Sequence, residues 1–393
     1  MLELLCPCCE QGRLEVFFEF ENVPTNSCIL LESQAEAVSW PKGNIRLAYC
    51  DNCGFVSNVA FDQKLTEYSA RYEETQAYSP TFNRFHESLV DQLIDRHDLR
   101  GKEIIEIGCG KGEFLDLLCR RGGNAGLGFD PGYSESRGAG FDKTRMKVVV
   151  DFFDERYSDE QADLVACKMT LEHIHRPLAF ARLAAAVVKR PDGVVFIQVP
   201  ESGRILQECA FEDIYYEHCS YFTGDSLGVL FDRLSFDVIH SEVTYGGQYL
   251  TVEARPRTGS GVSSNSVRSA ADGSPSAALV ESFGDRLGVR LNAWAERLQH
   301  WADAAKDVVL WGSGSKGVAF LASVPGADRI SRAVDINPYR QGYFMPGSGV
   351  PIVSPESLAS APPDAVVVMN RVYEDEIRRR LNELGMSPEV VSL

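Results

Sequence analysis

Residues 213–223 read DIYYEHCSYFT and concentrate side chains that can move protons. They comprise three tyrosines, a phenylalanine, two acids, a histidine, a cysteine, an isoleucine, a serine and a threonine. Neither helical periodicity nor strand alternation explains that mixture. Because the ordinary pKa of histidine suits acid–base work near neutral pH, His218 is the first candidate for chemistry. The alternative interpretation is an aromatic lid that packs on a core.

A glycine-rich turn, IIEIGCGKGEF, occupies residues 104–114 between a predicted buried strand and a predicted helix. Glycines allow the backbone to turn sharply and to approach a ligand without a Cβ clash. The spacing is GxGxG, whereas a dinucleotide site would need its third glycine where Glu113 stands. The next predicted strand ends in Asp130, whose carboxylate can accept both ribose hydroxyls of an adenosyl group. The three glycines are Gly108, Gly110 and Gly112.

This acid–glycine–acid pattern resembles the class I methyltransferases that use S-adenosyl-L-methionine (SAM). The resemblance implies that Glu106, at the end of the first strand, lies near the methionine amino group of SAM. It also implies that Asp151 and Phe152, after the third strand, contact the adenine. The alternative is a plain strand–turn–helix with glycines there by chance.

Two CxxC pairs near the start of the chain predict a metal site. Six of the 11 cysteines lie in the first 53 residues, within CPCC and CDNC motifs among others. Clustered cysteines in a reducing compartment indicate metal binding, and four thiolates form a closed tetrahedral zinc site with a structural role. Cys8 could substitute for a ligand, and a redox CxxC is the alternative. The expected ligands are Cys6, Cys9, Cys50 and Cys53.

A second glycine motif, VVLWGSGSKG at residues 308–317, has true GxGxxG spacing, and Asp335 ends the strand that follows. Alone it indicates a dinucleotide site, but a Rossmann domain that holds another nucleotide, or none, is at least as plausible an interpretation. Lys316 at the helix start is positioned to meet a phosphate. The motif glycines taken as nucleotide contacts are Gly312 and Gly314.

The segment KMTLEHIHRP, residues 168–177, follows the fourth predicted strand of the methyltransferase unit. Sites of parallel sheets lie at the carboxyl ends of the strands. We therefore expect Glu172, His173 and His175 near the methyl donor, with His173 as the first catalytic candidate and His175 as the second. The alternative is that LEH simply caps a helix.

The order of predicted elements places these motifs in an α/β protein. Strands and helices alternate twice, which predicts a doubly wound, largely parallel class I sheet and a C-terminal Rossmann-like domain behind an N-terminal zinc-binding domain. Residues 255–276 are rich in Ser, Gly and Arg and read as a linker or mobile loop. The expected units are a zinc-binding domain at 1–65, a helical connector that contributes to the active site at 66–99, the SAM domain at 100–255, a linker at 256–276 and the Rossmann-like domain at 277–393.

Composition restricts the partners. The 393 residues carry a net charge of −17, which disfavours general binding to nucleic acid but allows a small phosphorylated ligand in a pocket. No apolar run approaches the roughly 20 residues of a membrane helix, and the N-terminus lacks a basic region typical of secretory signals. We expect a cytoplasmic protein that does not bind membranes.

Across nearly its whole length the chain resembles the zinc-containing C-methyltransferases of nucleotide-activated deoxysugars. The resemblance rests on the two CxxC pairs, the SAM unit, YYEHCSYFT and GSGSKG…VDINPYRQGYFMPGSGVPI. It implies methylation of a carbon next to a ketone, with His218 as general base, and a C-terminal domain that helps hold the nucleotide of the sugar. The further site residues that it implies are Tyr215, Glu217, His173 and Tyr72.

Two departures from that family keep other functions open. Its Y-x-Y pair before the SAM unit is replaced here by Tyr72 and Glu74, and LEHIH is nearer to generic methyltransferases. Methyl transfer to oxygen or nitrogen of another small molecule is therefore an alternative, since positioning and modest base help can suffice there. Further alternatives are a bifunctional enzyme with a working NAD site and a zinc-knuckle interaction protein with a non-catalytic methyltransferase fold.

Overall fold

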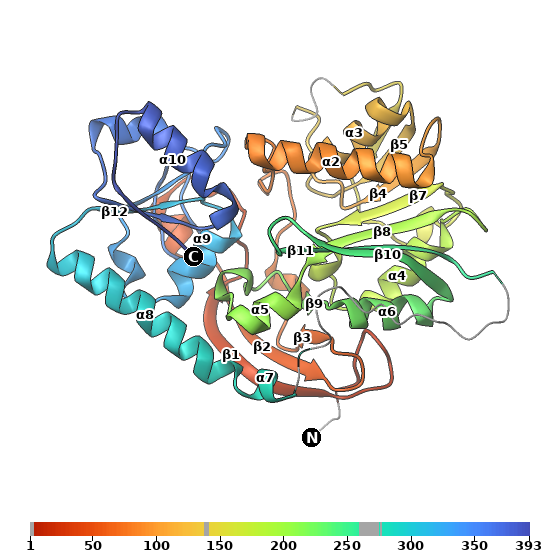
Figure 1. Ribbon diagram of the computed structural model, residues 1–393, viewed down its shortest axis with the longest axis horizontal. Coiled ribbons are helices and arrows are strands. Elements are labelled where there is room, and N and C mark those ends of the chain that lie inside the picture. The colour runs from red at the N-terminus through yellow and green to blue at the C-terminus, as the bar shows by residue number, and fades with distance from the viewer. Residues whose placement is uncertain (1–3, 137–140, 259–274, 276) are drawn as a thin grey trace.

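A computed structural model describes residues 4–136, 141–258, 275 and 277–393, and shows three β-sheets with associated helices (Figure 1). Most of the expected linker at 256–276 lies outside the described residues. Within these ranges no helix is long and apolar enough to cross a lipid bilayer. All eleven cysteines carry free thiols and are buried.

The N-terminal sheet is antiparallel and takes its last strand from far along the chain. Its spatial order is β1 (Leu14–Pro24), β2 (Lys42–Cys50), β3 (Val56–Asn58) and β9 (Ser220–Tyr221). Strand β9 belongs to the DIYYEHCSYFT segment and pairs Tyr221 with Val56 and Ser220 with Ser57. The segment assigned to the SAM domain from sequence is thus also an edge of the cysteine-bearing N-terminal unit. Short helices α1 (Gln34–Val38) and η1 (Gln63–Leu65) flank this sheet.

The central sheet has the strand order of a class I methyltransferase. Its seven strands, in spatial order, are β10 (Phe236–Thr244), β11 (Tyr249–Pro256), β8 (Val194–Pro200), β7 (Leu164–Lys168), β4 (Glu103–Ile107), β5 (Ala125–Phe129) and β6 (Met146–Val149). Strands β8 to β6 are parallel, and β11 joins β8 in the antiparallel direction. The predicted class I fold is confirmed, with the β10–β11 hairpin as an addition that the sequence reading did not specify.

Alternation along the central strands separates two cores, because neighbouring side chains point to opposite faces of a sheet. On one face Ile104 and Leu164 pack with α2 (Pro80–His97) and α3 (Glu113–Gly122). On the other face Ile105 and Val165 pack with α4 (Pro177–Ala186) and α6 (Gly224–Arg233). Helix α2 has Pro80 in its first turn, and Ser79 Oγ accepts a hydrogen bond from the Phe82 amide.

The C-terminal sheet is a five-stranded parallel Rossmann-like sheet, as predicted. Its spatial order is β14 (Ile352–Val353), β13 (Arg332–Val334), β12 (Val308–Trp311), β15 (Ala365–Val368) and β16 (Glu389–Ser392). Helices α9 (Ser315–Ser323) and α10 (Glu374–Glu383) belong to it, and α7 (Ala277–Glu281) and α8 (Phe283–Asp303) precede it. Helix α8 contacts β1, so the first and third sheets share one apolar core (Figure 1).

Three short elements link the central strands to the site. They are η3 (Leu171–His173) after β7, α5 (Ser202–Glu208) after β8 and η4 (Phe211–Asp213), which leads directly into DIYYEHCSYFT. All three follow the carboxyl ends of parallel strands, where ligands of doubly wound sheets bind. The fold therefore brings LEH and YYEH to the same edge of the sheet.

Candidate active site

A cavity of about 330 Å³ lies at the carboxyl ends of the central strands and holds most of the predicted SAM contacts. We call it the donor cavity. The loop after β4 forms one wall, and Gly108, Gly110 and Gly112 all have positive φ angles of 73°, 54° and 86°. A Cβ at Gly108 would collide with Thr170, so this wall requires glycine. Predicted residues that line the cavity are Glu106, Gly108, Gly110, Asp130, Asp151 and Phe152.

Two carboxylates face the donor cavity, one with hydrogen-bond partners for both oxygens and one with an oxygen that is unpartnered within the described ranges. Asp130 is held by the backbone, because its oxygens accept hydrogen bonds from Gly110 N (2.9 Å) and Gly132 N (2.7 Å). Glu106 is 1% exposed, and its Oε2 has no partner among the described residues. Burial raises the pKa of Glu106 to about 8, against the opposing effect of Lys168. A cationic ligand group would satisfy Glu106, as the predicted methionine ammonium does.

The residues that follow strand β6 give the donor cavity an aromatic rim. Phe152 is 53% exposed, although it is a large apolar side chain. The neighbouring Asp151 accepts hydrogen bonds from the Phe152 amide (2.8 Å) and from Tyr157 Oη (3.1 Å). An exposed ring beside a fixed carboxylate is a suitable surface for a heteroaromatic base.

His218 lies where the donor cavity meets a second cavity of about 240 Å³, which we call the acceptor cavity. Its Nε2 is 2.5 Å from Tyr215 Oη, and its ring centre is 5.0 Å from that of His173. Burial, and then the charge of His173, lower the pKa of His218 well below its ordinary value. Its Nδ1 is buried without a hydrogen-bond partner in the described part of the chain. The imidazole is therefore neutral and can accept a proton.

The tyrosines around the histidines differ in part from the sequence prediction. Tyr72 lines the donor cavity as predicted, and its ring centre is 5.3 Å from that of Tyr68. Tyr68 Oη lies 3.0 Å from His173 Nδ1, so Tyr68 is the residue that orients the second histidine. The sequence prediction missed Tyr68, although it stands four positions before Tyr72 in the same aromatic stretch. Burial lowers the pKa of His173 to about 4.

Glu217 requires a correction. It is fully buried and lines neither cavity. Its carboxylate accepts hydrogen bonds from Asn26 Nδ2 (2.9 Å), Ser27 N (2.8 Å) and Ser27 Oγ. Glu217 therefore fastens the N-terminal chain behind His218, in place of the expected position beside the reacting atoms.

The predicted nucleotide contacts line the acceptor cavity, but their polar groups already have partners. Gly312, Gly314, Lys316 and Asp335 are all in its wall. The Lys316 ammonium is 2.5 Å from Asp213 Oδ1, and Asp335 accepts hydrogen bonds from the amides of Ser313 (3.0 Å) and Asn337 (2.9 Å). Lys316 thus lines the cavity with its charge paired to Asp213 of the central domain, and Asp213 is also paired to Arg204.

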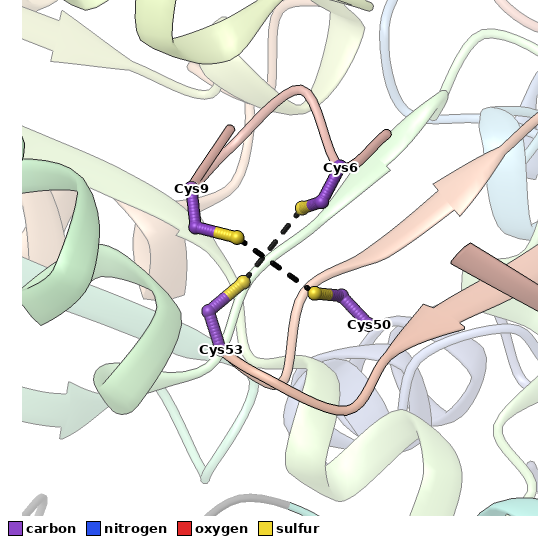
Figure 2. Close-up of side chains that lie close together, drawn as sticks. All are labelled: Cys6, Cys9, Cys50 and Cys53. Carbon is purple, nitrogen blue, oxygen red and sulfur yellow. Dashed lines mark hydrogen bonds between the residues drawn. The ribbon is translucent and has the colours of Figure 1, made fainter. Parts of the chain in front are cut away.

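The four predicted zinc ligands converge (Figure 2). Their sulfur atoms lie within 4.8 Å of one another, with Cys6–Cys53 and Cys9–Cys50 separations of 3.8 Å. Four sulfurs placed about 2.3 Å from a tetrahedral zinc would be about 3.8 Å apart, so the donor set fits that ion. Cys8 does not belong to the set, since its thiol contacts the Ser226 carbonyl at 3.5 Å.

The strand order and the donor cavity define a class I SAM-dependent methyltransferase. A methyltransferase domain model matches residues 79–241, and a C-methyltransferase C-terminal domain model matches residues 244–387. The chain therefore belongs to the SAM-dependent C-methyltransferases that combine these two domains.

The chain is also similar to individual proteins. The chain is 28% identical to the C-methyltransferase NovU of Streptomyces niveus over 324 residues, which cover 74% of this chain and 71% of NovU. It is 32% identical to the ubiquinone biosynthesis O-methyltransferase of Pseudomonas aeruginosa strain UCBPP-PA14 over 28% of this chain and 48% of that protein. The magnesium protoporphyrin IX methyltransferase ChlM of Synechocystis PCC 6803, solved with bound SAH, shares 14% identity over 45% of this chain and 84% of that chain, with a TM-score of 0.37.

Proposed function

We propose that this enzyme methylates a carbon next to the ketone of a nucleotide-activated keto-deoxysugar, with His218 as the general base. The observation that carries the proposal is the position of His218, a neutral imidazole in the walls of both the donor and the acceptor cavity. A base between the two ligands can take a proton from the carbon that then receives the methyl group. The resemblance of most of the chain to the C-methyltransferase NovU supports transfer to carbon.

The residues of this chain have separable tasks in such a reaction. SAM supplies an electrophilic methyl group on a sulfonium when it is bound in the donor cavity. Glu106 would hold the ammonium of the donor and Asp130 its ribose. Tyr215 orients the imidazole: when Nε2–H donates to Tyr215 Oη, the lone pair of His218 is at the unpartnered Nδ1.

The C-terminal domain supports the nucleotide part of the proposal by its place in the acceptor cavity. Gly312 and Gly314 bring bare backbone to the cavity wall, and the N-terminus of α9 begins at Ser315. Asp213 is shared between Lys316 and Arg204, so these three side chains keep a net positive charge that would favour a sugar-phosphate. The Cys₄ set would hold a zinc ion with a structural role, because a closed set of four thiolates leaves no open position.

Proton exchange in D₂O tests the proposal separately from methyl transfer. The enzyme is incubated with the demethylated donor and a nucleoside-diphosphate keto-deoxysugar, and deuterium at the carbon next to the ketone is followed by NMR. Wild-type enzyme should exchange that hydrogen, and His218→Asn should lose exchange and SAM-dependent methylation by at least about 100-fold, the usual contribution of a general base. His175→Asn is the matched control, because His175 lines neither cavity. Equal exchange in His218→Asn and wild type would refute the assignment of the base.

A further inference from the structure

Glu172 is a second buried acid that lines the donor cavity and lies close to His218, and the reaction described above does not use it. It belongs to η3 (Leu171–His173), is 1% exposed and lines the donor cavity. Neither carboxyl oxygen has a hydrogen-bond partner among the residues that the structure describes. Burying an unpaired carboxylate charge costs free energy, so Glu172 is either protonated or bound to a ligand group that satisfies its oxygens.

The surroundings of Glu172 favour the protonated form. One carboxyl oxygen, one nitrogen of His173 and one nitrogen of His218 lie within 4.8 Å of one another, and both imidazoles are neutral. Burial raises the pKa of Glu172 to about 8, with Lys168 opposing that rise. The groups that face it are Lys168 and Cys167 of β7, His173 of η3, His218, Cys219 and Tyr215 of the 213–223 segment, Tyr68, and Tyr249 of β11.

Near neutral pH the cluster therefore holds an acid with its proton beside a base without one. In water the two side chains would be ordered the other way, with the carboxyl ionised and the imidazole partly protonated. When the surroundings raise the pKa of one group and lower that of its neighbour, the first can act as the acid and the second as the base. Loss of a proton from carbon next to a ketone needs both, since the negative charge moves to the carbonyl oxygen.

We propose, resting on the function proposed above, that Glu172 is a further catalytic residue whose carboxylic acid donates a hydrogen bond to the carbonyl oxygen of the acceptor. The C–H bond breaks and its proton goes to His218, while its electron pair forms a C=C bond and the carbonyl π pair moves to oxygen. Glu172 stabilises that oxygen. The C=C pair then forms the new C–C bond to the methyl carbon, the S–CH₃ bond breaks, and the C=O bond re-forms. Glu172 keeps its proton, and His218 releases its own to solvent.

The same three side chains offer two nitrogens and one oxygen, a set that also suits a divalent metal with open positions. A metal would require an ionised Glu172 and would occupy the nitrogen that the base needs. The protonated acid is the better interpretation, because it leaves His218 able to take the proton.

Glutamine and alanine substitutions of Glu172 test the proposal in the full-length enzyme. Glu172→Ala should lower both kcat and exchange of the hydrogen next to the ketone by about 100- to 1000-fold, the usual effect of removing an oxyanion donor. Glu172→Gln keeps an N–H donor and should lose only about 10-fold in kcat, a part of that donor's contribution. At saturating SAM, wild-type kcat should fall above about pH 8, and Glu172→Gln should show no such fall. Glu212→Gln, a buried carboxyl that lines neither cavity, is the matched control.

Each contrary result has its own meaning. Wild-type turnover of the nucleoside-diphosphate keto-deoxysugar with full activity in both Glu172 variants would overturn the role of Glu172 and leave the proposed function standing. If the wild-type enzyme catalysed neither exchange nor methylation, the role of Glu172 and the proposed function would both be overturned. SAM affinity by calorimetry shows whether the variants fold, and Glu172→Gln with wild-type affinity but an unchanged alkaline fall would overturn the acid role. The acid role would also be overturned if mass spectrometry found a second metal ion besides the Cys₄ zinc, and if Glu172→Gln lost that second ion.

Discussion

Replacement of Glu217 by glutamine distinguishes a supporting role from a chemical one. The carboxylate receives hydrogen bonds from three donors, Asn26 Nδ2, Ser27 N and Ser27 Oγ, with its two oxygens. Glutamine has one carbonyl oxygen, and its amide N–H₂ would face a donor. At least one buried donor then loses its acceptor, which costs about 1–3 kcal/mol, and the remaining bonds lose charge assistance. We expect the free energy of unfolding to fall by roughly 2–4 kcal/mol.

The assay combines thermal unfolding with the D₂O exchange measurement. The melting temperature of Glu217→Gln should fall on the order of 2–5 °C. Exchange by the folded variant should stay within about 10-fold of wild type, because the base His218 is untouched. Ser27→Ala provides the matched partner, and the double variant should lose less stability than the sum of the single losses, with a coupling of about 0.5–3 kcal/mol. Wild-type melting together with a 100-fold loss of exchange would refute this reasoning and restore Glu217 to the reacting groups.

Three further perturbations test other parts of the structure. Cys9→Ser should lose the zinc by mass spectrometry, whereas Cys8→Ser should keep it; loss of zinc in both would contradict the assigned ligands. Glu106→Gln should weaken SAM binding about 10-fold or more in calorimetry, because a hydrogen bond to a charged group is worth about 1.5–3 kcal/mol; an unchanged affinity would disprove that contact. Burial lowers the pKa of His86 to about 2, so stability present above pH 6.5 is lost on acidification as the unfolded chain takes up a proton. Between pH 7 and pH 5, the free energy of unfolding of His86→Leu should fall less steeply than that of wild type, by up to about 1.4 kcal/mol per pH unit. Equal pH dependence in the two proteins would exclude His86 as a cause.

The sequence predicted well those features that one strand, turn and helix determine locally. The positive φ angles of Gly108 and Gly110, and the Asp130 carboxylate at the end of the next strand, follow from short-range spacing. The same is true of the zinc set, since each CxxC supplies a preformed half of it. Both sheets of the two alternating units were also predictable, because the apolar runs and their intervals are periodic.

What the sequence did not predict depends on segments that are distant along the chain. The direction of the Glu217 side chain is determined by Ser27, 190 residues earlier, and the charge of Lys316 is met by Asp213, 103 residues earlier. Spacing carries no information about such pairs. Tyr68 and Tyr72 stand in the same aromatic stretch, and only packing against His173 shows which hydroxyl reaches the ring.

The pairing of β9 with β3 has a consequence for how the protein is made. Val56 lies beside Tyr221, so the N-terminal sheet gains its last strand only when the ribosome has released residues 220–221. Until then β3 presents an open edge, the kind of surface on which nascent chains associate wrongly. The cysteine-bearing unit is therefore synthesised before the central domain but completed only after residues 220–221 have emerged. A fragment that stops before residue 220 should thus be prone to aggregation even when zinc is supplied.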